Sequence, residues 1–202
     1  MDHPVTTVDL IRHGEPVGGQ KYRGQTDDPL SEKGWAQMRA AIGGERPWHH
    51  IVSSPLVRCH AFAAELARQQ GLPLTVDARL MEVGFGEWEG RTPAELTAQD
   101  PHLLARFRRD PVNVRPAGAE PLEAFLARVA AAWDELVDAH TGKHVLVVCH
   151  AGVIRMVLTH VLGIPLARAY RIDVPIAGIT RITVEGTGPE AIARLRFHAG
   201  AL

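Results

Sequence analysis

The chain has 202 residues, of which 46% are hydrophobic and 22% charged, and its formal net charge is −1. This balance is typical of a globular protein with a sizeable core, and it argues against a broad basic surface for nucleic acid. The two cysteines, Cys59 and Cys149, form neither a metal-binding nor a disulfide-rich pattern. No apolar run approaches the ~20 residues that span a bilayer. No basic, apolar leader precedes the first strand-like segment, so we expect a cytoplasmic protein without a membrane partner.

Strands and helices are predicted to alternate along the chain. Runs of β-branched and apolar residues predict strands over 5–11, 50–53, 74–76, 144–149, 179–184 and 193–197. Apolar periodicity and terminal signals predict helices over 31–43, 54–70, 120–140 and 151–162, with short helical pieces at 92–98 and 101–109. In the second helix, Pro55 is expected in the first turn and Gly71 at the end. The alternation predicts an α/β fold, a three-layer α/β/α sandwich with a mostly parallel sheet. We expect one domain, in which residues 79–120 form an insertion over the site.

Three segments follow predicted strands and should meet at one edge of the sheet, where open α/β sheets bind their ligands. They are Arg12-His13-Gly14-Glu15, residues 53–58 (SSPLVR), and Cys149-His150-Ala151-Gly152. Arg12 offers a planar fork for phosphate oxygens, and a neutral His13 is a competent nucleophile towards phosphorus. A main-chain carbonyl near Gly14 would keep the other ring nitrogen protonated. Taken singly, each of these residues is more often structural.

The other two segments add groups that bind anions. Arg58 falls in the first turn of a predicted helix, whose free N–H groups favour anions. His150 can donate to a phosphate oxygen. Residues 80–90 (LMEVGFGEWEG) carry three carboxylates, Glu82, Glu87 and Glu89, one of which would be the general acid for the leaving oxygen. A flexible acidic loop is the alternative, and the residues alone do not choose among the three.

Together these segments resemble the histidine phosphatase superfamily in its phosphoglycerate mutase-like branch. Five motifs occur in the family's order over nearly the whole chain: RHGE, SSPLVR, MEVGFGEWEG, PAGAEPLEAFLARV and CHAG. The resemblance implies that His13 is the phosphorylated nucleophile and that Glu82 is the proton donor. It further implies that the phosphoryl oxygens are held by Arg12, Arg58 and His150. Because cationic groups offset the charge of the transferred group, no metal or other cofactor is expected.

Some positions depart from the family pattern. Many relatives have Thr or Ser after RHGE and Asn three residues later, whereas this chain has Pro16 and Gly19. We therefore expect Gln20 or Gln25 to supply the missing polar contact with substrate. Three segments, RHGEPVGG, YRGQTDDPL and VPIAGITRI, resemble α-ribazole phosphatases of cobalamin biosynthesis. This implies a small-molecule phosphate ester as partner, with α-ribazole 5′-phosphate as the first choice. A broad-specificity or sugar-phosphate phosphatase stays open. A phosphoglycerate mutase is less favoured because the chain is short for the cofactor-dependent enzymes.

Other interpretations remain. Residues 149–155 (CHAGVIR) also fit the C-x-x-G-x-x-R loop of cysteine-based phosphatases. Met156 follows where that loop has Ser or Thr, and RHGE would be unexplained, so we favour a buried, structural Cys149. A non-catalytic phosphate-binding protein is a second alternative, although such proteins tend to lose the nucleophile or the acid. Three arginines, Arg106, Arg108 and Arg109, fit a solvated helix face, or a gate if the insertion covers the pocket. Residues 174–182 would pair within one sheet or across a homodimer.

Overall fold

A single sheet of six strands forms the centre of the computed structural model, which describes residues 4–44 and 47–200. The strands are β1 (Val5–Arg12), β2 (His50–Ser53), β3 (Leu74–Val76), β4 (His144–Cys149), β5 (Ile179–Glu185) and β6 (Ile192–Gly200). Their order is β3-β2-β4-β1-β5-β6. The first four strands of this order are parallel, while β5 runs antiparallel to both β1 and β6. The predicted α/β fold with a mostly parallel sheet is confirmed.

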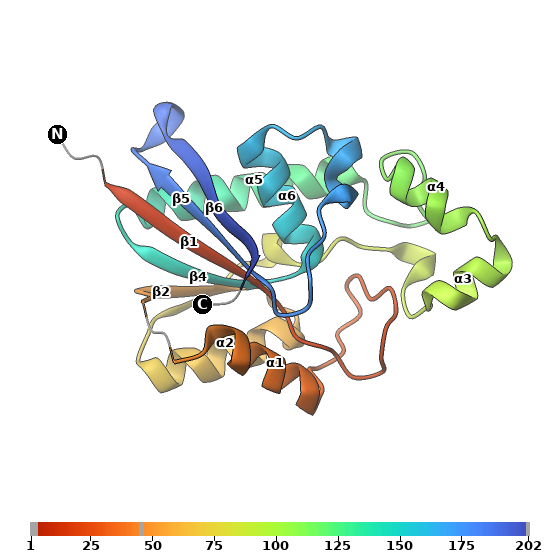
Figure 1. Ribbon diagram of the computed structural model, residues 1–202, viewed down its shortest axis with the longest axis horizontal. Coiled ribbons are helices and arrows are strands. Elements are labelled where there is room, and N and C mark those ends of the chain that lie inside the picture. Colours follow the sequence, from red (N-terminus) through yellow and green to blue (C-terminus); the bar gives the residue numbers. More distant parts are fainter. Residues whose placement is uncertain (1–3, 45–46, 201–202) are drawn as a thin grey trace.

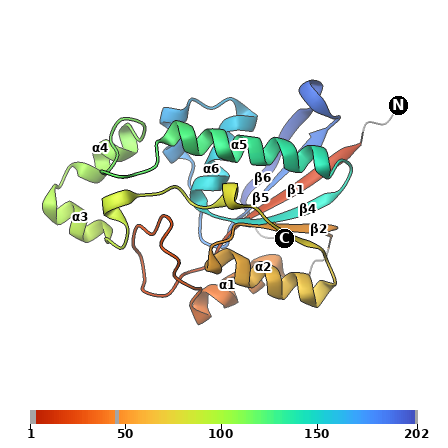
Figure 2. The same ribbon diagram turned by 180° about the vertical axis from the view of Figure 1, so that it is seen from behind.

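Helices cover both faces of this sheet, which gives three layers (Figures 1 and 2). One face carries α1 (Glu32–Ile42) and α2 (Val57–Gln70), and the other carries α5 (Leu122–Ala139) and α6 (Ala151–Leu162). The central strand β4 shows why its sequence is a continuous apolar run. Val145 and Val147 pack in the cluster with α5 and α6, and Leu146 and Val148 pack in the cluster with α1 and α2.

Two short helices, α3 (Pro93–Gln99) and α4 (Leu103–Arg109), lie beyond the end of the sheet to which the parallel strands run (Figure 1). Phe107 attaches α4 to the rest of the molecule, because its buried ring makes edge contacts with Trp88 and Tyr170 at 5.1 and 4.8 Å. The remaining helical turns are η1 (Ala78–Leu80), η2 (Gly86–Trp88), η3 (Leu166–Arg171) and η4 (Gly188–Glu190). The segment 79–120 thus borders the carboxyl end of the sheet.

The start of α2 was predicted wrongly. The helix begins at Val57, so Pro55 lies before it and not in its first turn. The first N–H groups are taken by the protein itself, because Asp27 Oδ1 accepts from Val57 N at 2.7 Å and Ser54 Oγ accepts from Leu56 N at 3.3 Å. This N-terminus is therefore not an open anion site.

The strand β5 has partners on both sides, β1 and β6. Of the two arrangements predicted for residues 174–182, the structure contains the pairing within one sheet. Across residues 4–44 and 47–200, no helix combines the length and the apolar character needed to cross a membrane.

Candidate active site

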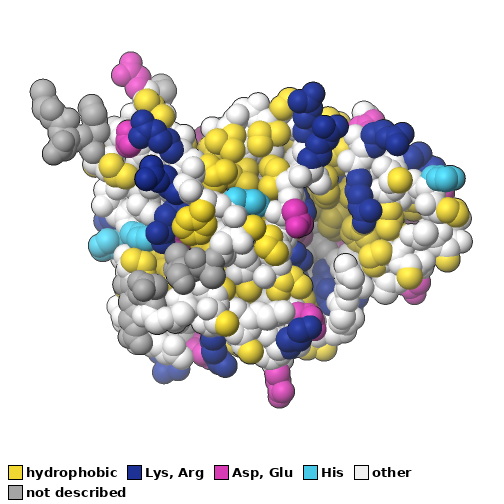
Figure 3. Space-filling model, in the orientation of Figure 1, with side chains coloured by type: hydrophobic (Ala, Val, Ile, Leu, Met, Phe, Trp, Pro, Cys, Tyr) yellow, Lys and Arg dark blue, Asp and Glu magenta, His cyan; other side chains and the backbone are white. Residues whose placement is uncertain are grey.

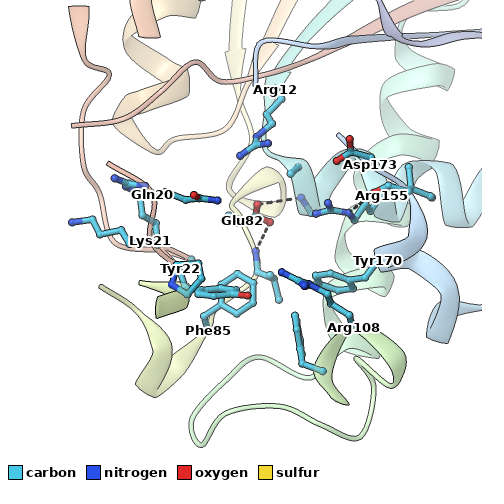
Figure 4. A pocket seen from close by; sticks show the side chains of 18 of the residues that line it. Arg12, Gln20, Lys21, Tyr22, Glu82, Phe85, Arg108, Arg155, Tyr170 and Asp173 are labelled. Carbon is cyan, nitrogen blue, oxygen red and sulfur yellow. Dashed lines mark hydrogen bonds between the residues drawn. The ribbon is translucent and has the colours of Figure 1, made fainter. Parts of the chain in front are cut away.

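A cavity of about 480 Å³ lies at the carboxyl end of the sheet, where β1 and β4 end beside the α3–α4 segment. The face in Figure 3 is hollowed between the sheet and this segment, and Lys and Arg side chains gather around the hollow. Five of the seven predicted site residues line the cavity: Arg12, His13, Gln20, Arg58 and Glu82. Figure 4 shows Gln20, Lys21 and Tyr22 on one wall and Arg155 and Tyr170 on the opposite wall, with Glu82 between them.

His13 follows directly after β1 and is buried, with 7% of its surface exposed. Its Nδ1 lies 2.7 Å from the main-chain oxygen of Gly14. Because a carbonyl oxygen only accepts hydrogen bonds, Nδ1 carries the proton and Nε2 keeps its lone pair in the neutral ring. Burial, reinforced by the nearby charges of Arg58 and Arg12, holds the pKa of His13 well below its usual value. The histidine is therefore neutral with a fixed tautomer.

Gly14 is needed for a contact with α1. A Cβ atom at this position would overlap the main-chain oxygen of Gly34, which lies in the first turn of α1. The close approach that this glycine permits is therefore between two segments of the backbone.

Two arginines bring positive charge to the cavity. Arg12 donates from Nη1 to the main-chain oxygen of Val174 at 2.6 Å. Arg58, which is 1% exposed, donates from Nη1 and Nη2 to the main-chain oxygens of Thr26 and Gly24, both at 2.7 Å. Neither forms an ion pair within 4–44 and 47–200, and the Nε atom of each is buried without a partner there. Both guanidinium groups are thus held by neutral carbonyls and keep their charge available.

His150 does not line the cavity, but its ring contacts the ring of His13, which does. Its ring centroid is 5.2 Å from that of His13, in an edge-to-face arrangement. Its Nε2 is 2.8 Å from Ser54 Oγ, and Cys59 Sγ lies 3.6 Å from the same nitrogen. Burial, followed by the charge of Arg58, holds the pKa of His150 well below its usual value. The two neutral histidines, His13 and His150, therefore lie side by side, close to the positive charges of Arg58 and Arg12.

Among the three carboxylates of residues 80–90, only Glu82 lines the cavity. Its Oε1 accepts from Val83 N at 2.9 Å, and its Oε2 accepts from Gly152 N at 3.1 Å, in the first turn of α6 (Figure 4). Glu87 is exposed. Glu89 instead accepts hydrogen bonds from the main-chain N–H groups of Gln25, Thr26 and Phe85 and so joins two loops.

The two glutamines differ in position. Gln20 lines the cavity, as expected of a residue that contacts substrate. Gln25 is not among the residues lining it, is exposed, and donates from Nε2 to the main-chain oxygen of Glu82 at 3.4 Å. The carbonyl of Gly19 is occupied by Arg23, whose Nη2 donates to it at 2.6 Å.

The thiol of Cys149 faces the core between the sheet, α5 and α6, and does not line the cavity. Burial raises the pKa of Cys149 well above its usual value, which disfavours a thiolate. Its main-chain oxygen accepts from His13 N at 3.0 Å. Arg155, the arginine of the C-x-x-G-x-x-R pattern, donates from Nε to the main-chain oxygen of Ile172 at 2.9 Å. This geometry supports the structural interpretation of the cysteine.

On the outer wall of the cavity, the sequence had named Arg108 as a gate and Arg155 only as part of the cysteine pattern, and it had not indicated Tyr170, Arg171 or Asp173. This wall includes Arg155, Tyr170, Arg171 and Asp173, and Arg108 adds to it from α4. These residues come from three elements with no shared motif, so only the fold brings them together. Across the described ranges, no three His, Cys, Asp or Glu side chains are arranged to hold a metal ion.

Known proteins match this chain in sequence and in fold. The model of the histidine phosphatase superfamily (branch 1) matches residues 8–195. A bifunctional protein of Mycobacterium tuberculosis is 36% identical over 148 residues, which are 71% of this chain and 40% of that protein. The chain thus spans about two fifths of the length of this relative. Glucosyl-3-phosphoglycerate phosphatase of the same organism is 36% identical over 132 residues, or 63% of this chain and 59% of the relative.

Solved structures share the whole fold. The native structure of mycobacterial glucosyl-3-phosphoglycerate phosphatase superposes with a TM-score of 0.87 at 28% identity, covering 98% of this chain and 100% of that one. The structure of a candidate α-ribazole-5′-phosphate phosphatase from Escherichia coli gives a TM-score of 0.79 at 25% identity, covering 96% of each chain. The similarity therefore extends over the sheet, the helices and the segment beside the cavity.

Proposed function

Because the chain belongs to branch 1 of the histidine phosphatase superfamily, we propose that it hydrolyses a small phosphate monoester through a phosphohistidine formed on His13. The phosphatases among its relatives support this activity. The observation that carries the proposed route is the neutral ring of His13 in a cationic cavity. Its Nδ1–H donates to the main-chain oxygen of Gly14, which leaves Nε2 free to attack.

In the first step, His13 Nε2 forms a bond to phosphorus while the ester P–O bond breaks. Glu82, in its protonated form, gives its proton to the departing oxygen, so that an alcohol leaves. The charge on the phosphoryl oxygens is offset by Arg12 and Arg58, which both line the cavity. The ring of His13 becomes positively charged as it is phosphorylated, and the carbonyl of Gly14 accepts from Nδ1 throughout.

In the second step, a water molecule attacks the phosphorus of the phosphohistidine. Glu82 accepts a proton from this water, the P–N bond breaks, and inorganic phosphate leaves with His13 neutral again. The proton that Glu82 gave in the first step is thereby restored. In this route His150 packs against the ring of His13, with 5.2 Å between the ring centroids, and no redox partner takes part.

Trapping of the intermediate tests this route. The protein is quenched during turnover of a phosphate-labelled aryl ester, and the label on the protein is followed in acid and in alkali. The expected label survives alkali, is lost in acid, and is missing in His13→Ala, whereas the surface variant His160→Ala keeps it. A label that survives acid, or that depends on Cys149, would refute the route. No label together with no turnover of any phosphate ester would support a phosphate-binding protein instead.

The charges of the cavity support a substrate with a second acidic group. Seven cationic side chains line the cavity against two carboxylates, Glu82 and Asp173. A phosphate monoester supplies about two negative charges, which leaves an excess of positive charge. Arg108 and Arg171 are exposed at this wall, and within residues 4–44 and 47–200 neither side chain makes a hydrogen bond or an ion pair. We therefore favour a phosphorylated sugar acid, in line with the glucosyl-3-phosphoglycerate phosphatase relatives.

A second candidate is α-ribazole 5′-phosphate, whose leaving group carries a flat aromatic base. Aromatic side chains on the cavity wall, Tyr22, Phe85 and Tyr170 among them, favour this substrate by stacking. The Escherichia coli structure and the three sequence segments noted above support it as well. A broad-specificity phosphatase would accept both candidates.

Two esters that differ only in the acidic group separate these substrates. The ratio of kcat/KM for 3-phosphoglycerate to that for glycerol 3-phosphate is measured in the wild type and in Arg108→Gln. We expect the wild-type ratio to exceed one and to fall about tenfold in Arg108→Gln, as for a lost charged contact. Arg109→Gln is the matched control, because Arg109 is an exposed neighbour outside the cavity wall. An unchanged ratio, with faster turnover of α-ribazole 5′-phosphate, would favour the second candidate.

A further inference from the structure

Arg128, in the second turn of α5, is joined to the loop that carries Glu82 (residues 79–84) by an unusual concentration of hydrogen bonds. Its Nη1 donates to the main-chain oxygens of Arg79 and Met81, at 2.5 and 2.8 Å. Its Nη2 donates to the main-chain oxygen of Glu82 at 3.2 Å. One guanidinium group thus fixes three carbonyls within four residues of the loop.

Glu120 completes the contact from the other side. Its carboxylate accepts from Nε and Nη2 of Arg128, at 2.7 and 2.8 Å, and from the main-chain N–H of Gly84 at 3.2 Å. The main-chain N–H of Glu120 donates to the oxygen of Gly84 at 3.0 Å. About four fifths of each side chain is shielded from solvent, with 21% of Arg128 and 19% of Glu120 exposed. The guanidinium also lies 4.5 Å from the ring centroid of Phe125, so its plane is fixed by packing.

We propose that Arg128 and Glu120 form a positioning pair that holds the Glu82 carboxyl group at the place where it protonates the leaving oxygen. Neither residue lines the cavity, so each acts through the backbone of residues 79–84 and not on the substrate. The planar fork of arginine is required, because five donors must reach Glu120 and three carbonyls at once. Lysine would keep the charge but lose this geometry. The inference rests on the proposed role of Glu82 as the proton donor.

Displacement of a proton donor has a kinetic signature that general loosening of the fold lacks. Phenolate is a poorer leaving group than 4-nitrophenolate and depends more on protonation as the ester bond breaks. The experiment therefore measures kcat/KM for 4-nitrophenyl phosphate and for phenyl phosphate on the same preparation of each variant. Any fraction of unfolded protein cancels from the ratio of the two values.

Four variants make the test complete: Arg128→Lys, Glu120→Gln, Glu82→Gln and Arg68→Lys. We expect the preference for 4-nitrophenyl phosphate to rise about tenfold or more in Glu82→Gln, and to rise also in Arg128→Lys and Glu120→Gln. Arg68→Lys, at an exposed position of α2, should keep the wild-type ratio. Glu120→Gln is the milder change and carries the test if Arg128→Lys does not fold.

The outcomes separate the inference from its premise. A rise in Glu82→Gln with the wild-type ratio in both Arg128→Lys and Glu120→Gln would overturn the positioning role and leave Glu82 as the donor. A wild-type ratio in Glu82→Gln would instead overturn the role of Glu82, and the positioning inference with it. A loss of turnover that is equal for both esters in Arg128→Lys and Glu120→Gln identifies a purely structural role and also rejects the inference.

Discussion

The carboxylate of Glu82 accepts a hydrogen bond from the main-chain N–H of Gly152 at 3.1 Å, so the loop after β3 meets the first turn of α6. This contact requires a glycine. A Cβ atom at residue 152 would overlap Glu82 Oε1 and would lie 3.0 Å from the ring of Phe125. The small residue of the CHAG segment thus makes room for the carboxyl group.

Gly152→Ala should therefore displace Glu82 from its place beside α6. Removal of a general acid typically lowers a rate by about 10²-fold or more, so we expect a loss of this order in kcat for phenyl phosphate. Turnover of 4-nitrophenyl phosphate should fall less. Ala151→Gly, one residue earlier in the same turn, is the control for changes of the helix terminus itself. Equal losses for both esters would contradict a specific effect on Glu82.

Cys149→Ala is expected to keep most of the activity. The thiol packs in the core, and only the main-chain oxygen of Cys149 contacts His13. Removal of one buried sulfur should cost about 1 kcal/mol of unfolding free energy. The measurements are kcat/KM for 4-nitrophenyl phosphate and the denaturant midpoint. A folded Cys149→Ala protein without activity would contradict phosphorylation of His13 and revive the cysteine mechanism.

Local patterns in the sequence predicted the parts of the fold that local forces decide. The strand β4 and helix α6 appear at their predicted bounds, because β4 is buried on both faces and Gly163 ends α6 in a left-handed conformation. The start of α2 was missed because its first N–H is bound by Asp27, thirty residues earlier. No sequence pattern around α2 indicates the contact between Val57 and Asp27.

The same distinction applies to the candidate site. Arg12 and His13 could be found because they lie at the end of strand β1, at the edge of the sheet where ligands bind. The residues themselves did not separate Glu82 from Glu89, since both lie in one short acidic segment. Their difference is tertiary: Glu82 meets α6, whereas Glu89 binds N–H groups of the loop around Gln25. Arg108 reaches the cavity only through the placement of α4.

The two buried histidines predict a loss of stability in mild acid. Burial is the main reason that the pKa values of His13 and His150 lie well below 6.5 in the folded protein. Between those lowered values and about pH 6.5, the unfolded chain binds protons that the folded protein does not, so the free energy of unfolding falls as the pH is lowered. Each histidine contributes a slope of up to about 1.4 kcal/mol per pH unit in this window.

Denaturant unfolding at several values between about pH 7.5 and about pH 5 measures this slope. His13→Asn and His150→Asn should each reduce it, because asparagine does not titrate. His102→Asn, at an exposed position, should leave it unchanged. If all three variants kept the wild-type slope, neither buried histidine would resist protonation in the folded protein.

Asp9→Asn tests a buried charge cluster within the sheet, close to the strand end that carries His13. The Asp9 side chain is fully buried, and its carboxylate accepts from Trp48 Nε1 at 2.9 Å and from Arg181 at 2.7 and 2.9 Å. It also lies 2.8 Å from His144 Nε2. Burial alone would raise the pKa of Asp9, but the hydrogen bonds from His144, Arg181 and Trp48 outweigh it and lower the pKa. The cluster connects β1, β4 and β5.

Loss of one partner from a buried ionic group typically costs about 3–5 kcal/mol, because the remaining charge is left uncompensated. We therefore expect Asp9→Asn to lower the free energy of unfolding by about 3 kcal/mol at neutral pH. Since the pKa of Asp9 is lowered, this contribution is present above the ordinary value of 3.8 and is lost as the pH falls through the folded value. The difference between Asp9→Asn and the wild type should shrink accordingly in strong acid. Asp138→Asn, an exposed carboxylate of α5, is the matched control. A loss no larger than that of the control would mean that the ion pairs do no more than offset the burial of the charge.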